Sequence, residues 1–155
     1  GRKMGRISFA GMSNFGSFTR EVRKVGVRLP EKAIVPYHKA VHMKMLDGIL
    51  KRSAVDTGFS RSNWRSSIGA PDAAVFGTRD RKTKYPGPES VVNESLGVIS
   101  ALRPYEVSYL SNGTDYILLL ENGQVKGIEK RNPQAAQGMV SVTLANFWAA
   151  GVGSA

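Results

Sequence analysis

A change in the pattern of apolar side chains near residue 56 limits the possible folds of this chain more than any other feature. Apolar side chains recur every three or four residues from Ile34 to Ile49, which is typical of a helix. From residue 59, a period of two places the side chains on two unlike faces, which favours a strand. Asp and Thr side chains bond nearby backbone N–H groups, and Gly adopts positive φ easily. We therefore predict a structural turn between helix and strand at Asp56, Thr57 and Gly58.

The segment from Phe59 to Ile68 is predicted to be a strand with two unlike faces. Trp64 and Ile68 share one face with small Ser residues, so we expect them to anchor the core. Arg61 and Arg65 lie on the other face and are expected to point outward, where they can contact a partner.

Asp-Thr-Gly is also the central motif of retroviral-type aspartic proteases, in which two carboxylates share a proton. A chain of 155 residues with one such motif would have to dimerise to supply the second Asp. The protease motif follows an apolar strand, whereas residues 50–55 have the pattern of a helix end. No later apolar-apolar-Gly segment clearly plays the supporting role. The context favours the structural turn, and we predict that the chain is not an enzyme.

Composition predicts a globular chain with no metal, no cofactor and no membrane partner. Hydrophobic residues make up 41% of the sequence, and no apolar run approaches the roughly 20 residues that a membrane helix needs. The first residues lack the apolar stretch of a signal peptide, and zero Cys fits a reducing compartment. His38 and His42 are four residues apart on the predicted helix, but two ligands alone rarely make a zinc site.

One domain is expected over residues 17–150. A basic, Gly-rich arm at residues 1–16 precedes it, and a frayed tail at residues 151–155 follows. The domain is predicted to begin with a short helix at residues 18–25 and a longer helix that ends near residue 52. Pro36 either kinks the longer helix or moves its start to about residue 35.

The elements after the turn are predicted from pattern and turn signals. The Asn112-Gly113 pair favours a tight turn with positive φ. Residues 116–121 fit either a strand or a short helix. The remaining predictions are a loop at 69–87, a helix at 89–102 with Val92, Leu96 and Ile99 on one side, a strand at 107–110 and a last helix at 139–150.

The net charge of +10 is concentrated in the first half of the chain. Residues 1–30 hold seven Lys and Arg and one Glu, whereas residues 88–155 hold more acids than bases. This distribution favours binding to a polyanion or an acidic protein surface, although a merely solvated surface would look the same. The basic residues expected at an interface are Arg2, Lys3, Arg6, Arg79, Arg81, Lys82 and Lys84, together with Arg61 and Arg65.

Three separated segments resemble one family, the neck and tail-completion proteins of tailed bacteriophages, which includes the lambda Z-type minor tail proteins. Residues 55–64 resemble its "VDTG-x-x-R-x-N-W" motif, and residues 109–123 its "SN-x-x-x-YA-x-x-LE-x-G" motif. Residues 134–140 are similar to its "Q-A-P-x-GMV" motif. Ile117 and Ala136 depart from the pattern. The resemblance covers roughly residues 17–150, and the order and spacing of the segments match.

The resemblance implies an α+β fold, with a long N-terminal helix and a second helix packed on a small, mainly antiparallel β-sheet. It implies a virion structural protein at the head–tail junction, made in the host cytoplasm and assembled into the neck. Copies are expected to form a ring, with six-fold symmetry as the favoured arrangement. The implied partners are head-completion or connector proteins and the tail terminator or tail tube proteins, with genomic DNA passing through the channel.

The alternative is a nucleic-acid-binding module that uses the basic N-terminal half of the chain. It rests on charge alone, since no helix-turn-helix or aromatic-rich basic strand motif is recognisable.

Overall fold

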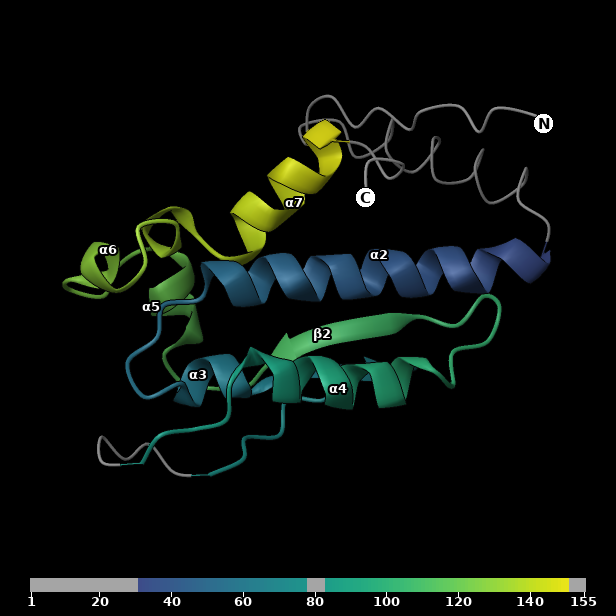
Figure 1. Cartoon of the computed structure of the whole chain (residues 1–155), viewed down its shortest axis with the longest axis horizontal. Coiled ribbons are helices and arrows are strands. Elements are labelled where there is room, and N and C mark those ends of the chain that lie inside the picture. Colours follow the sequence, from purple (N-terminus) through teal and green to yellow (C-terminus); the bar gives the residue numbers. More distant parts are fainter. Residues whose placement is uncertain (1–30, 78–82, 151–155) are drawn as a thin grey trace.

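The computed structural model describes residues 31–77 and 83–150, arranged along one long helix (Figure 1). The arm, the helix predicted at 18–25 and the tail lie outside the described residues, as do Arg79, Arg81 and Lys82. The elements, in chain order, are α2 (Glu31–Arg52), α3 (Phe59–Ser62), β1 (Trp64–Ile68), α4 (Pro88–Ile99), β2 (Ser108–Asn112), α5 (Ile117–Glu121), α6 (Ile128–Arg131), the 3-10 helix η1 (Ala135–Gln137) and α7 (Val140–Ala150).

Helix α2 confirms the predicted long helix and runs through Pro36. Within the described ranges, neither α2 nor any other helix is long and apolar enough to cross a bilayer. The helix ends at Arg52, where its last carbonyl groups find side-chain partners. The Ser53 hydroxyl donates to the Ile49 carbonyl at 2.9 Å, and Asn132 Nδ2 donates to the Lys51 carbonyl at 3.0 Å.

Strands β1 and β2 form a two-stranded antiparallel sheet, with Trp64 opposite Asn112 and Ile68 opposite Ser108. Helix α4 packs along β1, while α2 contacts both β2 and α4 (Figure 1). The α+β fold class is therefore confirmed. Helix α7 packs on the face of α2 that points away from the sheet, so the long helix has neighbours on two sides (Figure 1).

The core gathers apolar side chains from most of these elements. Trp64 is 6% exposed and packs in the same cluster as Leu46, whereas Ile68 at the end of β1 is only partly buried. The other buried members of the cluster are Ile49, Leu50, Ala54, Val91, Leu120, Ile128, Ala135 and Met139. Segments far apart in the sequence therefore depend on one another for burial.

The predicted strand at residues 59–68 is wrong in its first half. Gly58 has φ of 89°, and the chain then forms the single helical turn α3, in which the Ser62 N–H donates to the Gly58 carbonyl at 2.8 Å. The strand begins only at Trp64. Residues 117–121, which the sequence left open, are helical.

Two further predictions need correction. Helix α4 buries Val91, Ser95 and Ile99, while Leu96 is 51% exposed, so its inner face is rotated from the predicted one. Gly113 does not have the positive φ of a tight turn. Glycine is required at this position because the backbone of Ala73 approaches it closely. A Cβ on residue 113 would lie 1.9 Å from the Ala73 carbonyl oxygen.

Candidate functional site

The three segments that resemble the neck proteins contact one another in chain order, residues 55–64 with 109–123 and residues 109–123 with 134–140. Thr57 Oγ1 accepts a hydrogen bond from the Phe59 N–H at 3.3 Å, as expected of a turn residue. The Asp56 carboxylate is exposed and lies 3.8 Å from Arg131 Nη2 of α6.

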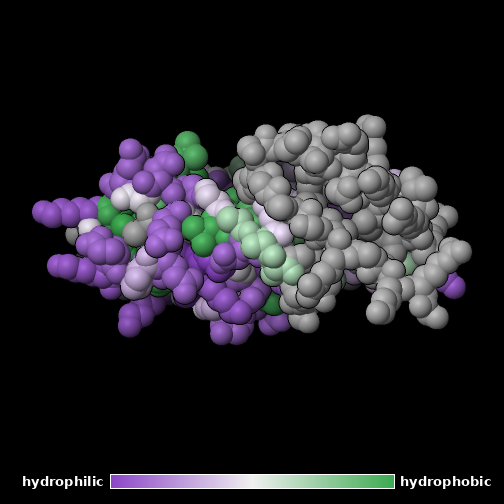
Figure 2. All heavy atoms as spheres, turned by 90° about the horizontal axis from the view of Figure 1, so that it is seen from above, coloured by the Kyte–Doolittle hydropathy of each residue, from purple (hydrophilic) through white to green (hydrophobic). Residues whose placement is uncertain are grey.

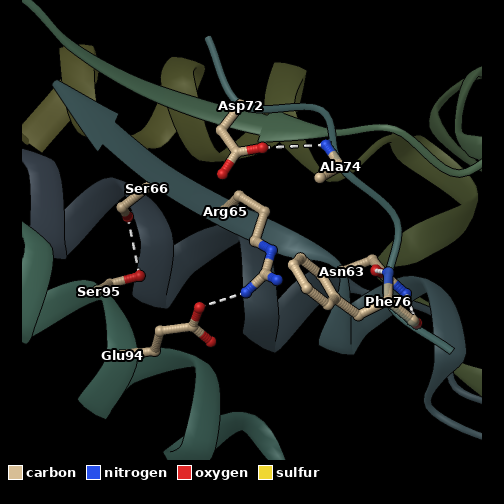
Figure 3. A network of polar contacts seen from close by, with 8 residues as sticks. All are labelled: Asn63, Arg65, Ser66, Asp72, Ala74, Phe76, Glu94 and Ser95. Carbon is tan, nitrogen blue, oxygen red and sulfur yellow. Dashed lines mark hydrogen bonds and ion pairs between the residues drawn. The ribbon is translucent and has the colours of Figure 1, made fainter. Parts of the chain in front are cut away.

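Asn63 joins the first segment to the following loop (Figure 3). Its side chain is 1% exposed; Oδ1 accepts from the Phe76 N–H at 2.7 Å, and Nδ2 donates to the Phe59 carbonyl at 2.8 Å. Nδ2 also lies 3.2 Å from the Phe76 carbonyl. Asn63 therefore joins the backbone of α3 to the backbone of the loop at Phe76.

The prediction that Arg65 points outward is wrong. Arg65 is 9% exposed; its guanidinium lies 3.4 Å from the centre of the Phe76 ring and pairs with Glu94 of α4 (Figure 3). Asn63 holds the backbone of Phe76 in place, so the phenyl ring stays over the guanidinium. Arg65 thus joins β1, α4 and the loop, and most of its surface is unavailable to a partner.

The second segment contacts the first through Asn112. Its Nδ2 donates to the Ser60 carbonyl at 2.8 Å, and its Oδ1 accepts from the N–H and hydroxyl of Thr114 at 3.1 and 2.7 Å. Asn112 therefore ends β2, shapes the turn after it and attaches that turn to α3.

The second segment contacts the third through Glu121. Oε2 accepts from the N–H groups of Met139 and Val140 at 2.8 and 3.0 Å, and Oε1 from the N–H and hydroxyl of Ser141 at 2.9 and 2.7 Å. Partial burial acts to raise the pKa of Glu121, but these hydrogen bonds outweigh it and hold the pKa below its usual value. The carboxylate caps the first turn of α7, where negative charge is favourable.

A pocket of about 180 Å³ lies beside the turn, and mainly apolar side chains line it. Its lining residues are Ala54, Asp56, Thr57, Gly58, Phe59, Ser60, Tyr116, Leu119, Leu120, Val125 and Arg131. A wider groove of about 640 Å³, between the end of α2 and the start of α4, shares Arg131 with the pocket and includes Arg61. An apolar pocket beside an ion pair suits contact with a protein side chain.

The described residues carry little of the net positive charge. Residues 31–77 and 83–150 hold twelve Lys and Arg against ten Asp and Glu, so most of the +10 belongs to the other residues. Of the predicted basic interface residues, Lys84 is exposed, Arg61 is partly buried and Arg65 is buried. Arg2, Lys3 and Arg6 fall outside the described part of the chain. Nowhere within that part do three or more His, Cys, Asp or Glu side chains gather as a metal site would need.

No family model matches this chain, and neither the curated proteins nor the solved structures contain a match. Pattern reasoning missed the roles of Glu121, Arg131 and Asn132. Each forms a hydrogen bond or an ion pair with a residue at least 18 positions away in the sequence, and local sequence pattern does not predict such contacts.

Proposed function

We propose that the chain is a virion structural protein of the head–tail junction of a tailed bacteriophage. Copies of it would form a ring, favoured to be six-fold, between head-completion or connector proteins and the tail terminator or tail tube. The observation that carries the proposal is that the three resembling segments bind one another. Asn112 contacts Ser60, and Glu121 contacts Met139 and Val140. These polar side chains are occupied in holding the domain together, which fits a structural part better than a catalyst.

Exposed apolar residues at two ends of the molecule support the ring. A ring requires two different surfaces on each copy, so that one copy can contact the next head to tail. Leu118 and Leu119 of α5 are 71% and 48% exposed, and Tyr105 and Val107 before β2 are 78% and 55% exposed. Figure 1 places α5 and the connection between α4 and β2 at opposite ends of the long axis. On the face shown in Figure 2, hydrophobic areas also interrupt the hydrophilic surface.

The nucleic-acid-binding alternative depends on residues other than those described, because the described ranges are nearly balanced in charge. Contact with genomic DNA in the channel remains part of the ring proposal.

The experiment is complementation of a phage that lacks this gene. Cells infected with the defective phage should accumulate DNA-filled heads and separate tails, which electron microscopy counts. Supplying the wild-type chain should restore joined particles, and Leu118→Asp should not. Glu129→Gln, a change at another exposed position, is the matched control and should restore them fully. Normal joining without the chain would refute the proposal. Salt-sensitive DNA binding by a chain that never assembles would favour the alternative.

A further inference from the structure

A line of hydrogen-bonded polar side chains lies between α2, the sheet and α4. His38 Nε2 and His42 Nδ1 each lie 2.8 Å from Ser108 Oγ of β2. His42 Nε2 lies 2.8 Å from Ser66 Oγ of β1, which in turn donates to Ser95 Oγ of α4 at 2.8 Å. We call these five residues the histidine–serine network. His42, Ser66 and Ser95 are 5%, 9% and 2% exposed.

The hydrogen atoms of the network can be assigned in order. Because Ser66 gives its proton to Ser95, it must accept from His42 Nε2–H. Nδ1 of a neutral His42 is then an acceptor, so Ser108 donates to it and accepts from His38 Nε2–H. With both rings neutral, every one of these contacts has one donor and one acceptor.

Protons disturb this arrangement. A protonated His42 carries a donor on Nδ1 in place of the acceptor. If His38 is protonated as well, its ring also offers only donors. The Ser108 hydroxyl then faces two donors and has no acceptor for its own proton. The first proton also places a positive charge where few groups can compensate it.

No carboxylate of the described residues faces His42 from the elements packed around it. On α2, His38 faces it, whereas Lys39 donates to the Ser100 carbonyl. On α4, Glu94 pairs with Arg65, and Arg65 occupies the opposite face of β1 from Ser66. Tyr109, the titratable residue of β2, alternates with Ser108 and so also lies on that opposite face.

We propose that the histidine–serine network is an acid-sensitive attachment that keeps α2 on the sheet at neutral pH and releases it when both histidines become protonated. This goes beyond the proposed function and does not depend on it. Burial and the neighbouring His38 lower the pKa of His42 to about 4, and burial lowers the pKa of His38. The attachment is therefore complete above the ordinary His pKa of 6.5 and is lost as the pH falls toward 4.

The test is nuclear magnetic resonance of the wild-type chain, whose only two histidines give separate imidazole signals. The His42 signal should titrate near pH 4. Amide exchange protection in α2 should fall with it, while the amides paired between β1 and β2 keep their protection. A His42 midpoint near 6.5 would overturn the proposal, and so would loss of protection in α2 and the sheet together, which is global unfolding.

Two variants make the test specific. His42→Gln keeps a donor and an acceptor but does not titrate, so the urea midpoint should depend less on pH between 6.5 and 4.5 than in the wild type. Ser67→Ala is the matched control, because the Ser67 hydroxyl donates to Ala70 at the exposed end of β1. It should retain the wild-type pH dependence. Equal pH dependence in His42→Gln and wild type would overturn the proposal, and the wild-type titration decides the matter if His42→Gln does not fold.

Discussion

The Glu121 carboxylate should contribute more to stability than any other acidic side chain of the described ranges. It accepts three backbone N–H groups and one hydroxyl at the start of α7. In Glu121→Gln, the new amide N–H group faces backbone donors and cannot accept from them. Loss of a helix cap costs about 0.5–2 kcal/mol, and loss of the favourable charge at the helix N-terminus about 0.3–1 kcal/mol. We expect Glu121→Gln to lower the free energy of unfolding by about 2 kcal/mol.

Urea denaturation at pH 7, followed by circular dichroism, measures this loss. For a chain of this length it corresponds to a melting temperature about 4–8 °C lower. Glu129→Gln is the matched control, since Glu129 is exposed on α6, and it should leave the midpoint unchanged.

The pH dependence of Glu121→Gln provides an independent check. The pKa of Glu121 lies below 4.5 in the folded chain, so its contribution is present above pH 4.5 and is lost as the pH falls through the lowered pKa. The free energies of wild type and Glu121→Gln should therefore converge in acid. A difference below about 0.5 kcal/mol at pH 7, or one that persists unchanged at pH 3, would show that the carboxylate does not act as a charged cap.

Three further changes test the remaining contacts. Trp64→Ala should cost about 3–5 kcal/mol, because it empties a buried aromatic site; a melting temperature within two degrees of wild type would contradict this. Asn63→Ala should cost about 2 kcal/mol and expose residues 69–77 to limited proteolysis, because Phe76 loses its buried partners; an unchanged digestion pattern would count against it. Asp56→Asn should change stability by less than about 1 kcal/mol, since its ion pair is exposed; abolition of any proteolytic activity of the chain would instead revive the protease alternative.

Local pattern was sufficient for the features that depend on neighbouring residues. Helix periodicity over residues 34–49 predicts α2, and the turn chemistry of Thr57 and Gly58 predicts its interruption. An apolar Trp among small residues marks a buried position. These signals work because a helix turn, a positive φ and a side-chain period involve residues within about four positions of one another.

The candidate site was less predictable, because distant partners control it. Arg65 has an outward position on an isolated strand, but Phe76 and Glu94 cover it in the folded chain. Glu121 meets α7 across 18 residues or more, and His38 meets Ser108 across 70. The predicted strand includes residues 59–62, yet Gly58 and the contact from Asn112 to Ser60 favour one helical turn. Sequence pattern records the preferences of each segment, whereas burial and hydrogen-bond satisfaction depend on which segments the completed fold brings together.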